Sequence, residues 1–180
     1  MTDLRLRETA LPPSAADRTA LERMMAALQD FERETEPNRE PGADMAADHV
    51  EALIGEALRE GGGAILAEDA AGPCGFILCL MQTEFGRLVA PENRRYGVLT
   101  DLWVEPRARG RRLGHRLIEA AEARLAALGA RRIEVTAIAG NAQAQALYAA
   151  AGYAPSAVTM AKRVGSPRGP SRRCPPPRAR

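Results

Sequence analysis

The sequence predicts a single α/β domain built around a mixed β-sheet. Amphipathic helical segments alternate with short apolar segments of strand length, two strands are joined by a tight turn, and two others are separated by a helix. A hairpin pairs its strands antiparallel, whereas a strand–helix–strand unit pairs them in parallel, so both kinds of pairing are expected in one sheet. The 180 residues are enough for one domain with a hydrophobic core.

The first half of the chain is predicted to form a strand, two helices and a hairpin. These elements are expected over residues 4–8, 14–31, 45–58, 64–68 and 75–82. Apolar residues alternate or run continuously in the strands and recur every three to four positions in the helices. Ser14, followed by Asp17 three residues later, is typical of a capped helix start. Residues 69–73 supply the hairpin turn.

The second half is predicted to alternate strands and helices. These elements are expected over residues 97–104, 113–128, 131–138, 141–151 and 157–164. The first of these helices has the strongest pattern, because Leu113, Leu117 and Leu125 share one face and Gly129 ends it. Asn141 is a typical N-cap for the second helix. We therefore place a folded domain at residues 1–164.

Composition excludes several classes of protein. Residues 165–180 hold five arginines and no acidic residue, and they are expected to form a disordered Pro/Arg-rich tail. The rest of the chain has 20 basic and 23 acidic residues, so its charge gives no support for nucleic-acid binding. No apolar stretch approaches the ~20 residues of a membrane span. The N-terminus has no secretion signal, so a cytoplasmic protein without a membrane partner is expected.

The three cysteines show no metal-binding or redox spacing. Cys74 and Cys79 lie in or beside an apolar strand, where cysteine behaves as a small hydrophobic residue, and Cys174 lies in the tail. No metal is expected.

Residues 101–114 carry the most specific local pattern. A strand ends at Val104, and a turn containing Arg109, Gly110, Arg111 and Arg112 leads directly into a helix. The first N–H groups of a helix have no partner within it, and the helix dipole adds partial positive charge there. The segment therefore favours a phosphate or pyrophosphate ligand. A solvated basic helix end is the alternative, because short Gly/Arg patterns are weak motifs.

This segment resembles the acetyl-CoA signature of the GNAT superfamily of acyl-CoA-dependent N-acetyltransferases. That signature is Arg or Gln, two residues, Gly, one residue, then Gly or Ala. Arg109 and Gly114 match its ends, whereas Arg112 stands where the middle glycine is expected. Backbone N–H groups supply most of the pyrophosphate contacts, so Arg112 is compatible with binding if its backbone is helical and its side chain points outward.

A second segment, residues 141–153, strengthens the resemblance. It resembles the family's asparagine followed by a helix that ends in Leu-Tyr, with a glycine and an aromatic residue after it. The resemblance implies that Asn141 contacts the cofactor and that Tyr148 is the general acid. The alternatives are that Asn141 is only an N-cap and Tyr148 only a core aromatic residue.

The resemblance implies a mixed, mostly antiparallel sheet flanked by helices, and transfer of an acetyl group from acetyl-CoA to a primary amine. Transfer would be direct, in a ternary complex, with a backbone N–H of Trp103 or Val104 facing the thioester carbonyl. The residues implied to contact acetyl-CoA are Leu102, Trp103, Val104, Arg109, Gly110, Arg111, Arg112, Leu113, Gly114, His115 and Asn141. A non-catalytic CoA-binding or interaction module on the same fold is the alternative.

The general base is less clearly indicated. Many relatives carry Glu-Asp before this strand's Leu-x-Val, and here the pair is Thr100-Asp101. Asp101 is the first candidate, and Glu84, near the end of the preceding strand, is the second. His115 is expected to flank phosphate, and His49 to be structural or exposed.

The acceptor is expected at two irregular segments, residues 32–44 and 82–96. The first is rich in acidic residues and would suit a cationic amine, although a solvated loop explains it as well. The partner would be a small-molecule amine or a protein amine, and a homodimer is left open.

Overall fold

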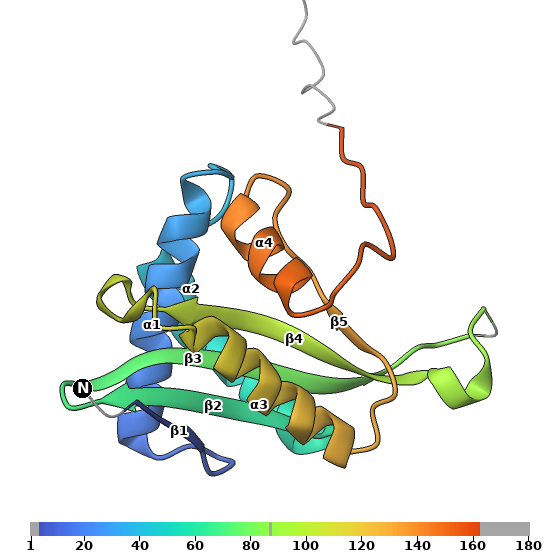
Figure 1. Cartoon of the computed structure of the whole chain (residues 1–180), viewed down its shortest axis with the longest axis horizontal. Helices are drawn as coiled ribbons and strands as arrows, with labels where there is room; N and C mark the ends of the chain where they lie inside the picture. Colours follow the sequence, from blue (N-terminus) through green and yellow to red (C-terminus); the bar gives the residue numbers. More distant parts are fainter. Residues whose placement is uncertain (1–3, 87, 163–180) are drawn as a thin grey trace, which may run out of the picture.

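The computed structural model describes residues 4–86 and 88–162, which form a five-stranded sheet with helices on both faces (Figure 1). The strands are β1 (Arg5–Glu8), β2 (Gly62–Asp69), β3 (Gly72–Thr83), β4 (Arg95–Val104) and β5 (Ile133–Val135). The helices are α1 (Ala15–Arg33), α2 (Gly42–Glu60), α3 (Leu113–Ala127) and α4 (Ala142–Ala150), with short 3-10 turns at Pro91–Asn93 and Pro106–Ala108.

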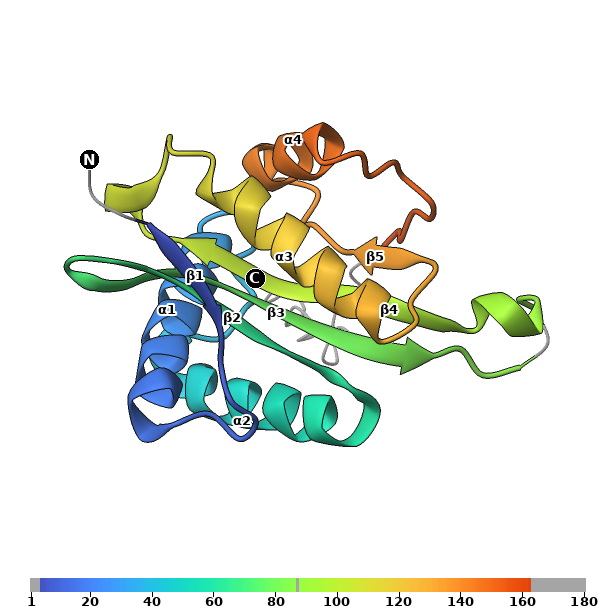
Figure 2. The same cartoon turned by 60° about the horizontal axis from the view of Figure 1, so that its bottom comes forward.

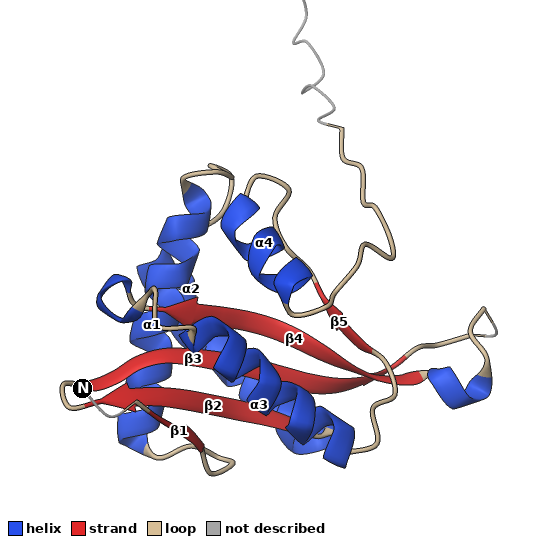
Figure 3. Ribbon diagram, in the orientation of Figure 1, coloured by secondary structure: helices blue, strands red, loops and turns tan. Residues whose placement is uncertain are grey.

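The strands lie in the order β1-β2-β3-β4-β5 (Figure 3). The first three pairings are antiparallel, and β4 pairs with β5 in parallel after the crossover through α3. This confirms the predicted mixed, mostly antiparallel sheet.

Helices α1 and α2 cover one face of the sheet and α3 covers the other (Figure 2). Alternate residues of β2 and β3 divide between the two cores: Phe76 and Leu78 pack against α1 and α2, whereas Ile77 and Cys79 pack against α3. Such two-sided burial explains why these strands read as continuous apolar runs.

The predicted cap of α1 is also present. The Ser14 hydroxyl accepts a hydrogen bond from the Asp17 N–H at 3.2 Å, which satisfies one of the free donors of the first turn.

A β-bulge interrupts β4 at Thr100. Leu78 of β3 pairs with Asp101 and Cys79 pairs with Leu99, so the register skips one residue. Leu99 faces α3, as Leu102 does, whereas Asp101 lies on the side of α1 and α2. The bulge thus reverses the alternation of side chains, as an extra residue in one strand must.

The predicted strand over residues 157–164 is wrong in its described part. Residues 157–162 form no strand, and Val158 and Met160 are 83% and 91% exposed. Their alternation with polar residues imitates a strand, but these residues pair with no other strand of the described chain. Strand β5 is also shorter than the predicted residues 131–138.

The predicted tail, residues 165–180, and Cys174 lie outside the described residues. Among the residues that are described, no helix combines the length and the apolar character that crossing a membrane requires.

Candidate active site

Strands β4 and β5 separate beyond the middle of β4. Their pairing covers only Gly97–Leu99 against Ile133–Val135. The later part of β4 carries Leu102, Trp103 and Val104, and helix α4 lies beside this opening (Figure 2). Peptide groups along a strand point alternately to its two sides, and the later part of β4 has no strand on its β5 side. This edge of β4 therefore presents backbone donors and acceptors to a ligand.

The turn after β4 carries an unusual backbone conformation. Arg112 is the N-cap of α3 and has φ 56° and ψ 19°, the left-handed region that favours glycine. The helical backbone at Arg112, which is the condition for its compatibility with pyrophosphate binding, is therefore not present. The hydrogen bond from Arg116 N–H to the Arg112 carbonyl (3.2 Å) lies at the start of the helix. The N–H groups of Leu113, Gly114 and His115 precede it and are the donors expected to bind an anion.

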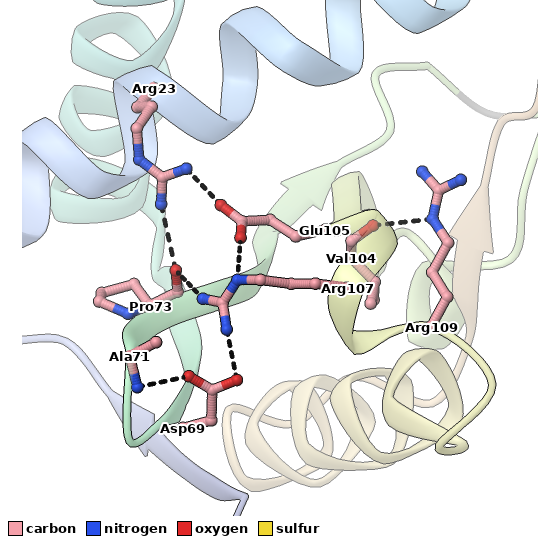
Figure 4. A network of polar contacts seen from close by, with 8 residues as sticks. All are labelled: Arg23, Asp69, Ala71, Pro73, Val104, Glu105, Arg107 and Arg109. Carbon is pink, nitrogen blue, oxygen red and sulfur yellow. Dashed lines mark hydrogen bonds and ion pairs between the residues drawn. The ribbon is translucent and has the colours of Figure 1, made fainter.

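Ion pairs hold this turn against the β2–β3 hairpin (Figure 4). The Arg107 guanidinium contacts the carboxylates of Asp69 and Glu105, and Arg23 of α1 contacts Glu105 from the other side. Hydrogen bonding from Arg107 lowers the pKa of the Asp69 carboxyl, and the charge of Arg111 adds to this effect. The segment is thus anchored before the helix begins.

A cavity of about 340 Å³ lies between β4, the turn and α4, and is called here the β4–α4 pocket. Its lining includes every predicted cofactor residue except Arg111: Leu102, Trp103, Val104, Arg109, Gly110, Arg112, Leu113, Gly114, His115 and Asn141. Arg112 is thus one of the residues that line the pocket. Phe31 and Leu28 of α1 close its inner side.

Two residues bring α4 close to this pocket. The side-chain Oδ1 of Asn141 accepts a hydrogen bond from Ala144 N–H at 3.0 Å, so Asn141 is an N-cap as well as a pocket residue. A Cβ added at Gly114 would lie 3.0 Å from a methyl group of Leu147, tighter than ordinary contact. The glycine therefore allows α3 and α4 to approach each other.

An arginine covers the aromatic wall of the β4–α4 pocket. The Arg109 guanidinium lies 4.8 Å from the ring centre of Trp103 and 5.7 Å from that of Phe31. Its Nε donates to the Val104 carbonyl at 3.0 Å. The indole N–H of Trp103 is buried and has no protein partner. A ligand that carries an acceptor would satisfy it.

A second cavity, of about 250 Å³, lies on the α1 and α2 side of β4 and is called here the α1–α2 pocket. It is lined by Met25, Leu28, Gln29, Glu32, Arg39, Glu40, Met45, His49 and Asp101. Leu28 lines both cavities, and Asp101 in one is followed directly by Leu102 in the other. The two pockets therefore adjoin at β4.

Five titratable side chains line the α1–α2 pocket: Glu32, Arg39, Glu40, His49 and Asp101. His49 Nε2 lies 3.5 Å from Asp101 Oδ2, and hydrogen bonding to Asp101 raises the pKa of His49. Burial raises the pKa of Glu32, and the charge of Asp101 adds to that rise, although Arg39 opposes it. Arg39 Nη2 binds Glu32 Oε2 at 2.6 Å, which ties the loop after α1 to the helix.

Tyr148 lies close to the same charges from the side of α4. Burial, with the negative charges of Asp101 and Glu32, raises its pKa to about 12. Its ring meets that of Tyr153 edge-on, with centroids 6.1 Å apart. The phenol therefore keeps its proton at neutral pH, and Tyr148 is among the lining residues of neither pocket.

Glu84 is not brought to either pocket. It follows the far end of β3, where its carboxylate binds Arg132 at 3.2 Å. Conversely, sequence reasoning did not place His49 or Glu32 beside Asp101, because their proximity arises only when α1 and α2 pack on the sheet. Among the described residues, no cluster of three or more His, Cys, Asp or Glu side chains could hold a metal.

Comparisons with known proteins agree with this architecture. A model of the acetyltransferase (GNAT) family matches residues 21–153. A comparison with curated proteins finds no match. Aminoglycoside N-acetyltransferase AAC(6')-Iy, solved with CoA, is 14% identical over 91% of this chain and 96% of its own, with a TM-score of 0.68.

Two further solved structures show the same fold. A GCN5-related N-acetyltransferase from Ralstonia eutropha JMP134 is 22% identical over 90% of this chain and 99% of its own, with a TM-score of 0.69. Aminoglycoside 6'-N-acetyltransferase AAC(6')-Ih from Acinetobacter baumannii is 14% identical over 91% of this chain and all of its own (100%), with a TM-score of 0.64.

Proposed function

Because the chain belongs to the acetyltransferase (GNAT) family, we propose that it moves an acetyl group from acetyl-CoA to a primary amine. The acetyl donor occupies the β4–α4 pocket and the amine occupies the α1–α2 pocket. The observation that carries the proposal is that these two cavities adjoin at β4, with Asp101 on one side and Leu102–Val104 on the other. Transfer is then direct, within a complex that holds both substrates.

The β4–α4 pocket fits a CoA thioester. The first N–H groups of α3 and the side chains of Arg109 and Arg112 supply positive charge for a pyrophosphate. The edge of β4 and the unpartnered indole N–H of Trp103 supply donors for amide or carbonyl oxygens. When bound, the thioester supplies an activated acetyl group, and a β4 backbone N–H faces the carbonyl oxygen as negative charge grows there.

The α1–α2 pocket fits a cationic amine. Glu32 and Asp101 line it, and their negative charges attract an ammonium group. Arg39 pairs with Glu32 and His49 lies beside Asp101, so each carboxylate is partly engaged and the two attract the ammonium group together. Aminoglycosides, polyamines, protein lysines and N-terminal amines all carry such a group.

The proton balance assigns a role to Tyr148. An alkylammonium must lose one proton before it attacks, and the departing thiolate must gain one when the carbon–sulfur bond breaks. Tyr148 donates its proton to the sulfur, and it regains one from the nitrogen that has formed the new carbon–nitrogen bond. The net products are an acetylated amine, CoA with its thiol protonated, and one proton released to solvent.

The test is a screen for CoA release with a panel of amines, including kanamycin, spermidine and a lysine-containing peptide. Binding of CoA is measured separately by calorimetry. Release of CoA that depends on an amine supports the proposal. Tight CoA binding with no turnover of any amine would contradict it and favour a non-catalytic CoA-binding module.

Two variants then test the assigned roles. Tyr148→Phe removes the proton donor and is expected to lower kcat by about 10²-fold, within the usual range for general acid catalysis, with CoA affinity unchanged. Asp101→Asn is expected to raise KM for the amine and to lower kcat. Unaltered turnover in both variants would rule out these roles.

A further inference from the structure

His49 lies in the α1–α2 pocket beside Asp101, where the amine is proposed to bind. It lies on α2, its Nε2 is 3.5 Å from Asp101 Oδ2, and its side chain is 38% exposed, against 15% for Asp101. The imidazole therefore lies between the less exposed carboxylate of Asp101 and the solvent. A purely structural histidine would not need the cavity, yet both residues line it.

We propose that His49 is the general base that takes the proton from the acceptor amine, and that Asp101 is the carboxylate that orients its imidazole. This inference rests on the proposed acetyl transfer. Because Asp101 faces Nε2, the Nδ1 atom is the one that accepts the proton. The imidazole then releases that proton to solvent from its exposed side.

Proton affinity favours an imidazole for this role. In model compounds a lysine-like amine has a pKa of ~10.4, an imidazole ~6.5 and a carboxyl ~4. The equilibrium constant for proton transfer from the ammonium group to an imidazole is therefore about 10⁻⁴, compared with roughly 10⁻⁶ for transfer to a carboxylate. A base whose pKa lies near the working pH is the more effective catalyst.

The charges around His49 come from several elements. Asp101 on β4 contacts it directly and raises its pKa, while Arg39, in the loop before α2, acts in the opposite direction. Glu32 on α1 lies in the same pocket, paired with Arg39, and Glu40, in the same loop as Arg39, also lines it. Since the protonated imidazole cannot act as a base, the rate falls as the pH decreases through the raised pKa of His49.

The first test needs no substrate. The chain has two histidines, so NMR of the imidazole protons gives two titrations, and the variant His115→Gln identifies which belongs to His49. We expect His49 to titrate above ~6.5 and to titrate at a lower pH in Asp101→Asn. A His49 titration that Asp101→Asn leaves unchanged would overturn the pairing.

The second test uses the best amine of the screen. His49→Gln keeps a polar side chain of similar size and is expected to lower kcat/KM by about 10²-fold or more, and to abolish the acidic limb of the pH profile at the titration point of His49. The exposed neighbour Asp48 on α2 provides the control, because Asp48→Asn should leave the profile unchanged. Added imidazole is expected to restore part of the activity of His49→Ala.

Each result decides one claim. A pH profile that is identical in His49→Gln and the parent protein, or a His49→Ala variant that imidazole does not rescue, would overturn the role of His49 while the proposed function stands. Absence of turnover with every amine would contradict the proposed function itself, and the role of His49 with it. The NMR titration reports the pairing with Asp101 in either case.

Discussion

Replacing Arg112 with glycine is expected to stabilise the protein, although it removes a charge from the β4–α4 pocket. Arg112 begins α3 with φ 56° and ψ 19°, where the Cβ of any residue other than glycine is crowded by its own backbone. Its side chain makes no capping hydrogen bond to the helix. The contributions that remain for Arg112 are therefore to ligand binding, through the backbone N–H groups of the turn and the charge of its guanidinium.

The size of the effect follows from two opposing terms. Left-handed backbone costs a residue with a Cβ about 1–2 kcal/mol, and Arg112→Gly removes that cost. Glycine has more freedom in the unfolded chain, which returns about 0.5–1 kcal/mol. The net expectation is a gain of roughly 0.5–1 kcal/mol, or a rise in Tm of about 1–4 °C for a chain of this size.

The assay compares Arg112→Gly with Arg112→Ala. Both variants remove the guanidinium, but alanine keeps the strain, so thermal unfolding should separate them while calorimetry of CoA binding should not. Loss of one charge-assisted contact is expected to weaken CoA by about 10-fold in both. If Arg112→Gly unfolds at the same temperature as Arg112→Ala, or lower, the argument from backbone strain is refuted.

Three more outcomes are expected. Gly114→Ala places a methyl group against Leu147, and should cost about 1 kcal/mol in urea unfolding and weaken CoA; unchanged CoA affinity would contradict the close approach. CoA binding should change the fluorescence of Trp103, the only tryptophan, by moving Arg109 from its ring, and Arg109→Ala should abolish most of that change. Because the pKa of Tyr148 is raised to about 12, its phenol should stay protonated below pH 10. Any decline in the steady-state rate below pH 10 should therefore come from another group and should persist in Tyr148→Phe.

Most of the fold could be predicted because its signals are local. Helices α1 and α3 carry their own apolar faces, and Ser14 caps the first of them as predicted. The segment around Val158 and Met160 shows the limit of such reasoning. Alternation specifies a surface that could join a sheet, but whether an edge lies within reach depends on the path of the whole chain.

The candidate site shows the same difference between signals that are local in the sequence and contacts that arise only in the folded chain. The turn from Arg109 to Gly114 is contiguous, so its chemistry could be predicted from sequence, and the β4–α4 pocket contains all of that range except Arg111. The α1–α2 pocket joins three distant segments, and no pattern within any one of them indicates that His49 meets Asp101. The left-handed backbone at Arg112 was also unexpected, although a family glycine at that place was its signal.

The bulge in β4 did leave a trace in the sequence. Leu99 and Leu102 both face α3, yet they are three residues apart, an odd spacing that a regular strand cannot place on one face. Because side chains alternate along a regular strand, this spacing indicates an extra residue between Leu99 and Leu102 and places Asp101 and Trp103 on the face away from α3.

Thr100 is the extra residue of the β4 bulge and takes no part in the regular pairing with β3. Shortening the loop between β3 and β4 by one residue would alter only the length of a connection. Deleting Thr100 would instead give a regular strand in which Leu99 still opposes Cys79 and Asp101 still opposes Leu78, so each side chain would keep its present face and only the local bulge would be lost. The strand can therefore lose one residue at the bulge and keep both its core face and its pocket face, whereas one residue lost where the pairing is regular would move the side chains beyond it to the opposite face.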